Sequence, residues 1–200
     1  MEELTVETAN GPAKVLLSDP ETTARGLLVL GPGASGFIGS GDLELACRVA
    51  LGRGMAAALV QPPYAVAGRR VPPRGTQTDE AFTAVTAGLR SRLPDGPLIT
   101  GGRSYGGRVA CRTSEVTGSD GVVCLAFPLQ PPKGRPSRQD ELSAVTVPVL
   151  VVQGESDPFG MPEPPASGEI VVVKGDHSLK ADAPLIREAI GRWLDARLAI

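Results

Sequence analysis

One stretch of the chain decides its fold: Pro97-Leu98-Ile99-Thr100-Gly101-Gly102-Arg103-Ser104-Tyr105-Gly106-Gly107-Arg108-Val109-Ala110. A short apolar run enters a glycine-rich corner, and a helical pattern of alanine and valine leaves it. Glycines stand two positions before and two positions after Ser104. A serine raised on a sharp strand-to-helix turn crowds its neighbours, so the flanking positions must be small. The stretch therefore predicts a strand, a tight turn with Ser104 at its tip, and a helix.

The spacing Gly102-x-Ser104-x-Gly106 is that of a nucleophile elbow, a turn that exposes a serine hydroxyl. The first amides of the following helix point to the same place, a geometry that suits attack on an ester or thioester carbonyl. Because 25 of the 200 residues are glycine, the pattern also fits a plain turn with a helix-capping serine. The residues that surround Ser104 in the fold must decide between the two.

Length and composition are those of an ordinary globular chain, which we expect to form one domain over residues 1–200. The net charge is −2 and no basic stripe is present, so nucleic acid is not an expected partner. The sequence lacks a signal core and a membrane-length apolar run, which predicts a cytoplasmic protein without a membrane partner. Cys47, Cys111 and Cys124 lie in apolar stretches without metal-ligand spacing. They are predicted to be reduced and buried, and we expect no metal and no cofactor.

Hydrophobic patterning predicts a hairpin followed by alternating strands and helices. Asn10-Gly11 is a strong turn signal between strands over 4–8 and 13–17. Continuous apolar runs predict buried strands over 26–30, 56–60, 98–100, 122–125, 149–152 and 170–173. Helical spacing predicts helices over 42–51, 76–89, from the elbow to about 114, and 184–198, with loops over 61–75 and 127–138. This order predicts an α/β fold, a mostly parallel sheet with an N-terminal antiparallel hairpin and helices on both faces.

Ligands of parallel sheets bind beyond the carboxyl ends of the strands, and three reactive residues follow predicted strands there. Ser104 follows the strand over 98–100, Asp157 follows 149–152, and His177 follows 170–173. A single histidine is most often an ordinary core or surface residue, but any imidazole base in this chain must be His177. The chain order Ser, Asp, His is that of α/β hydrolases. The order favours an elbow over a capped turn.

Two carboxylates compete as the third member of this set. Asp157 begins an Asp-Pro-Phe-Gly turn that can fix its side chain, and we prefer it to Glu155. Asp176 stands next to the histidine, and its side chain would normally point away from Nδ1. We interpret Asp176 as a turn residue.

An oxyanion hole needs two amides near the attacked carbonyl. One is expected from Tyr105, directly after the serine. The second is expected from the loop Gly31-Pro32-Gly33-Ala34-Ser35-Gly36, with Ala34 preferred and Gly33 as the alternative. Pro32 has no N–H, and the loop also fits a plain strand-to-helix turn.

The chain resembles the small, lidless α/β hydrolases of the dienelactone-hydrolase-like kind. Within them it is most similar to the bacterial group that shares a domain with a non-specific-lethal chromatin-complex subunit and a testis-expressed animal protein. The segments that carry the resemblance span nearly the whole chain: 28–34, 61–64, 68–70, 101–108, 125–132, 152–160 and 175–179. It implies a Ser104–Asp157–His177 triad and no lid domain. Pro32 and Gln130 stand where the group usually carries histidine, and Ser104 stands where dienelactone hydrolases carry cysteine, so their substrate is not carried over.

Three further residues are predicted to contact substrate: Gly33, Arg69 and Phe127. Arg69, next to Arg70 in the loop over 61–75, would clamp an anionic acyl or phosphate group. Solvated loop arginines are the more common outcome for such a pair. Arg103 is expected to tie neighbouring loops together. The loop over 127–138 is too short for a lid domain, which predicts a shallow, open site.

The sequence thus predicts a serine hydrolase that cleaves esters or thioesters of small molecules through an acyl-enzyme on Ser104. An acyltransferase or a peptidase would use the same residues. A non-catalytic binding module on a hydrolase fold is the alternative from another functional class. The presence of all three triad candidates favours the enzyme.

Overall fold

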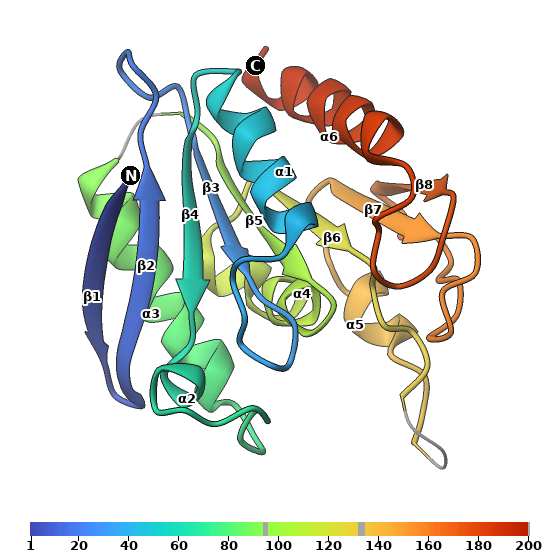
Figure 1. Ribbon diagram of the computed structural model, residues 1–200, viewed down its shortest axis with the longest axis horizontal. Helices are drawn as coiled ribbons and strands as arrows, with labels where there is room; N and C mark the ends of the chain where they lie inside the picture. The colour runs from blue at the N-terminus through green and yellow to red at the C-terminus, as the bar shows by residue number, and fades with distance from the viewer. Residues whose placement is uncertain (94–95, 132–134, 200) are drawn as a thin grey trace.

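An eight-stranded β-sheet forms the centre of the computed structural model, which describes residues 1–93, 96–131 and 135–199 (Figure 1). The strand order is β1-β2-β4-β3-β5-β6-β7-β8. The strands are β1 (Glu2–Thr8), β2 (Gly11–Ser18), β3 (Leu27–Gly31), β4 (Ala56–Gln61), β5 (Leu98–Arg103), β6 (Gly121–Leu125), β7 (Val149–Gly154) and β8 (Gly168–Val173). Strands β3 to β8 run parallel to one another, and β2 of the hairpin β1–β2 pairs antiparallel with β4. The predicted α/β fold with its N-terminal hairpin is confirmed.

The hairpin turn forms where Asn10-Gly11 predicted it. Gly11 has a φ of 101°, a left-handed conformation that glycine adopts without a side-chain clash. The Thr8 hydroxyl accepts from the Asn10 amide at 3.1 Å and donates to the Gly11 carbonyl at 2.7 Å.

Helices cover both faces of the sheet because alternate strand residues point to opposite sides. Leu28, Leu30, Ile99 and their neighbours face the helices α1 (Gly41–Leu51) and α6 (Ala183–Leu198), which lie side by side (Figure 1). Leu27 and Val29 face the other way. That second face is covered by α3 (Gln77–Arg92), α4 (Tyr105–Thr117) and the short α5 (Gln139–Ser143).

Three features differ from the sequence prediction or lie beyond it. A short helix, α2 (Pro63–Val66), occupies part of the predicted loop over 61–75, and α5 had no predicted counterpart. Helices of four and five residues are too short to show a periodic pattern. The strand over 170–173 was predicted to be buried, and this is wrong: β8 is the last strand of the sheet, and Val172 is 48% exposed. A valine-rich run favours a strand equally at the edge and in the centre, so the pattern could not place it.

The three cysteines are free and buried, as predicted. Among the residues that the structure describes, no helix has the length and apolar character needed to cross a membrane.

The first turn of α4 packs directly on the end of β3. A Cβ atom added to Gly106 would overlap the carbonyl of Gly31 and would lie 2.7 Å from the carbonyl oxygen of Pro32. Both obstacles are backbone atoms, which cannot rotate away. The glycine at position 106 therefore lets the serine-bearing turn and the loop after β3 come together at one edge of the sheet.

We predict that Gly106→Ala lowers the free energy of unfolding by about 1–3 kcal/mol, because the added methyl overpacks this backbone contact. Gly88→Ala is the matched control, since Gly88 lies within α3 and an added Cβ meets no atom within 4 Å. Alanine favours a helix over glycine by up to about 1 kcal/mol, so this control should be at least as stable as the wild type. Urea unfolding of both variants checks the pair. Equal stability of Gly106→Ala and the wild type would contradict the close packing.

Candidate active site

Ser104 occupies the strained turn between β5 and α4. Its φ is 49° and its ψ is −108°, a conformation that residues with side chains rarely adopt. The turn is held on both sides, because the Ser104 amide donates to the Leu125 carbonyl at 2.8 Å and the Ser104 carbonyl accepts from the Arg108 amide at 3.3 Å. Strain of this kind persists where the surrounding structure enforces it, and it is typical of functional sites.

The structure brings Ser104, His177 and Asp157 together in one hydrogen-bonded chain. Ser104 Oγ lies 3.0 Å from His177 Nε2, and His177 Nδ1 lies 2.8 Å from Asp157 Oδ2. The three residues follow β5, β8 and β7, whose parallel carboxyl ends meet at this edge of the sheet. The Asp157 side chain is 1% exposed and the His177 side chain is 19% exposed, so the chain runs from the interior to the surface. Both distances are within the range needed for proton transfer or orientation of the ring.

Asp157 is fixed by two donors besides the histidine. The Phe159 amide donates to Oδ1 at 2.9 Å, and Gln153 Nε2 donates to Oδ2 at 3.0 Å. Gln153 is fully buried at the end of β7, and the same nitrogen lies 3.1 Å from the carbonyl oxygen of Phe127 and 2.9 Å from that of Gly160. Gln153 was not predicted from the sequence as a site residue. The sequence feature that could have indicated it is its place, since this amide side chain directly follows the apolar run of a buried strand.

Within the described residues, the hydrogen-bond partners of the histidine ring are Asp157 and Ser104 rather than Glu155 or Asp176. Glu155 is exposed. Asp176 Oδ1 accepts from the Ser178 amide at 2.8 Å and from its hydroxyl at 2.6 Å. These hydrogen bonds hold the pKa of Asp176 below its usual range. Asp176 is therefore the turn residue that the sequence predicted.

Arg103 holds the loop that carries the histidine. Its Nη1 lies 2.6 Å from Asp42 Oδ2, and its Nη2 donates to the His177 carbonyl at 3.1 Å. Asp42 is in the first turn of α1, and its side chain is 1% exposed. The arginine thus links α1, the serine turn and the histidine loop, as the sequence analysis expected. The Phe159 ring packs against the His177 ring, with ring centres 4.6 Å apart.

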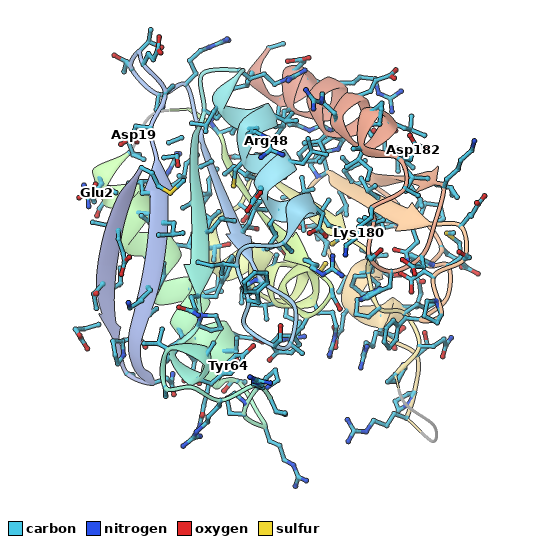
Figure 2. All side chains as sticks on the ribbon, viewed as in Figure 1. Glu2, Asp19, Arg48, Tyr64, Lys180 and Asp182 are labelled. Atoms are coloured by element: carbon cyan, nitrogen blue, oxygen red, sulfur yellow. The ribbon has the colours of Figure 1, made fainter. Side chains whose placement is uncertain are left out.

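The loop after β3 lies beside the serine. A Cβ atom added to Gly33 would be 3.9 Å from Ser104 Cβ. The Tyr64 hydroxyl donates to the Ala34 carbonyl at 3.0 Å, and burial raises the pKa of this phenol, which keeps its donated proton in place. Tyr64 comes from α2, at the end of the molecule to which β3, β4 and β5 point (Figures 1 and 2). Within the described residues, the Ala34 and Tyr105 amides donate to no protein acceptor.

Ser104, Tyr105, Ala34 and Phe159 line one open cleft of about 850 Å³. Its size lies within the range of small-molecule sites. Pro32 and Gln130, which stand where the resembled group usually carries histidine, each lie next to a residue that lines this cleft. Pro32 is buried next to Tyr105, and the backbone amide of the exposed Gln130 donates to the Phe159 carbonyl at 2.7 Å.

The three predicted substrate contacts, Gly33, Arg69 and Phe127, are not among the residues that line this cleft. Gly33 still lies beside Ser104, whereas the other two lie elsewhere. The Phe127 ring is 0% exposed and packs in the core with residues such as Cys124 and Leu142, so its prediction as a substrate contact is wrong. The apolar run of β6 continues through Ala126 into this residue, and such a run does not show whether its last member lies in the core or at the surface. Arg69 is exposed and lines a separate hollow with Tyr64 and Gln77, so it is not a contact of the Ser104 cleft either.

Comparison with known proteins agrees with this geometry. A family model described as an alpha/beta hydrolase domain matches residues 43–185. The chain belongs to the alpha/beta hydrolase family. No curated protein matches the sequence. The narrower resemblance to the group of the chromatin-complex subunit and the testis-expressed protein stays a prediction.

Several solved structures share the fold of this alpha/beta hydrolase at low sequence identity. XC6422 from Xanthomonas campestris, described as a serine hydrolase without a lid, has a TM-score of 0.82 at 18% identity, over 98% of this chain and 94% of that one. Est1E from Butyrivibrio proteoclasticus, solved with ferulic acid bound, has a TM-score of 0.80 at 13% identity, over 98% and 100%. A cold-adapted esterase from an Arctic intertidal metagenomic library has a TM-score of 0.74 at 15% identity, over 98% and 92%.

We predict that Asp42→Asn lowers the free energy of unfolding by about 2–3 kcal/mol, because it leaves Arg103 without its buried counter-charge. Asparagine keeps the oxygen that accepts from the Leu43 amide, so the helix start is preserved. Asp195→Asn is the matched control: its pair with Arg53 is largely exposed on the Asp195 side and should cost less than about 1 kcal/mol. Urea unfolding measures both. Similar losses in the two variants would show that the Arg103 pair is an ordinary surface contact.

Proposed function

We propose that this alpha/beta hydrolase is a serine hydrolase that cleaves carboxylic esters or thioesters of small molecules. The observation that carries the proposal is the chain from Ser104 Oγ through the His177 ring to Asp157, with distances of 3.0 and 2.8 Å. This set of hydrogen bonds begins at a strained serine that lines an open cleft and ends at a buried carboxylate.

In the proposed reaction, Ser104 Oγ attacks the carbonyl carbon of the substrate, and His177 Nε2 takes the hydroxyl proton. Asp157 accepts a hydrogen bond from Nδ1, which holds the ring in the productive tautomer and stabilises the imidazolium that forms. When the C–O or C–S bond breaks, His177 returns the proton to the leaving alcohol or thiol. Water then attacks the acyl-enzyme with the same histidine as base, and the acid leaves.

The negative oxygen of the tetrahedral intermediate would bind the amides of Tyr105 and Ala34. The Tyr105 amide opens α4, so the helix dipole favours negative charge there. Both residues line the Ser104 cleft, and neither amide has an acceptor among the described residues. Gly33, which also approaches Ser104, would keep this side of the cleft free of side chains.

Three observations favour an enzyme over a non-catalytic binding module. The site keeps a strained nucleophile candidate, a buried acid, and a buried amide, Gln153, that donates to that acid. A binding module would gain nothing from this arrangement. We further propose that residues 1–200 act as one catalytic domain. Transfer of the acyl group to an acceptor other than water would use the same residues. Hydrolysis of a peptide bond would use them too.

We predict that a fluorophosphonate probe adds one adduct to the wild type and none to Ser104→Ala, measured by intact mass. Ser104→Ala and His177→Ala should each lower kcat/KM for short para-nitrophenyl esters at least about a thousandfold. Ser35→Ala is the matched control, since Ser35 is an exposed serine of the neighbouring loop. An unlabelled wild type that is folded by circular dichroism would contradict the proposal.

The identity of the acid is tested by a pair of amide substitutions. Asp157→Asn should lower kcat about 10³- to 10⁴-fold, because the asparagine amide favours the wrong histidine tautomer. Glu155→Gln should have little effect, since that exposed side chain does not contact the ring. Steady-state kinetics on the same ester measures both. The reverse result would assign the role to Glu155.

A further inference from the structure

The cleft that contains Ser104 is lined by an unusual number of arginines for a chain whose net charge is −2. Besides Ser104 and Tyr105, its walls include Arg74, Arg108, Arg112, Arg135 and Arg138. These residues come from three separate places: the loop before α3, the exposed side of α4, and the segment that leads into α5. Their gathering around the serine is a property of the fold and is not visible as a basic run in the sequence.

Only part of this positive charge is paired. Glu141 binds Arg108 through two hydrogen bonds of 2.6 and 2.8 Å and also contacts Arg112 at 3.2 Å. Asp79 binds Arg112 through two hydrogen bonds of 2.7 Å. Five arginines and two carboxylates leave three positive charges in excess.

The unpaired charges belong to Arg74, Arg135 and Arg138. Within the described ranges, none of these three has a carboxylate at ion-pair distance. Arg138 is half-buried, and its Nη1 donates to the Pro128 carbonyl at 2.7 Å, which fixes the guanidinium at the cleft wall. Its burial, and then the repulsion of Arg108, lowers the pKa of Arg138. Such an environment favours the binding of a negative group.

We propose that the substrate of this site carries an anionic group, a carboxylate or a phosphate, that binds Arg138 together with Arg135 and Arg74. A guanidinium binds both groups through paired, charge-assisted hydrogen bonds. The cleft volume of about 850 Å³ fits a small molecule whose ester lies at Ser104 and whose charged end lies at the arginines. The inference rests on the proposed hydrolase function and names its substrate class.

Matched ester pairs test the proposal in the wild type. For a charge on the acyl side, mono-para-nitrophenyl adipate is compared with its neutral methyl ester. For a charge on the alcohol side, para-acetoxybenzoate and para-acetoxyphenyl phosphate are compared with methyl para-acetoxybenzoate. We expect kcat/KM to favour at least one anionic ester by about tenfold or more, the usual effect of a hydrogen bond between charged groups. The preference should shrink as the salt concentration rises.

Substitutions then assign the preference to residues. Arg138→Gln should reduce the ratio of anionic to neutral kcat/KM about tenfold. Arg135→Gln, at an exposed position, should reduce the same ratio without a risk to folding. Arg187→Gln is the charge-matched control, because Arg187 is an exposed arginine of α6 that does not line the cleft. A wild type without anionic preference, or a preference that both cleft variants leave unchanged, would overturn the proposal.

A binding measurement separates this proposal from the proposed catalysis. Calorimetry of Ser104→Ala with mono-para-nitrophenyl adipate does not depend on turnover. We expect binding that weakens about tenfold when Arg138→Gln is added, and no such loss with Arg187→Gln. If the wild type has no esterase activity but binding depends on Arg138, the catalytic proposal is contradicted and the anion site is not. If neutral esters are turned over but binding does not depend on Arg138, the anion site is contradicted and the catalytic proposal is not.

Discussion

The backbone of the first turn of α4 lies directly against the backbone at the end of β3, and the geometry of the site depends on this contact. Glycines at 31 and 106 make it possible, because a side chain at 106 would occupy the space of a carbonyl group. The contact brings Ser104, the Tyr105 amide and the loop of Gly33 and Ala34 to one end of the cleft. The aspartate and the histidine follow β7 and β8, two parallel strands whose carboxyl ends lie at the same edge of the sheet as the serine.

The fold was predictable from the sequence to the extent that it depends on local patterns. Asn10-Gly11 set the hairpin, continuous apolar runs set the central strands, and the glycines around Ser104 set the elbow. The order of strands does not follow from such patterns, since an apolar run carries no information on its neighbours. For this reason the edge position of β8 and the exposure of Val172 were missed.

In the candidate site, too, the residues set by local sequence patterns were predictable and those set by tertiary packing were not. His177 was predictable because it is the only histidine and follows a strand, and Asp157 because a proline turn begins there. Gln153 and the cleft arginines act through contacts with residues far along the chain, such as Phe127 with Gln153 and Asp79 with Arg112. Contacts of that kind are set by tertiary packing. Phe127 failed as a substrate contact for the same reason, because only the packed sheet shows that its ring lies in the core.

We propose that a strained serine, with two backbone amides beside it, forms the covalent intermediate. A crystal structure of the protein after reaction with a phosphonate ester tests it most directly. We expect phosphorus bonded to Ser104 Oγ, with the phosphonyl oxygen about 2.7–3.1 Å from the Tyr105 and Ala34 amide nitrogens. A phosphonate attached to another side chain, or an oxygen turned away from both amides, would contradict it.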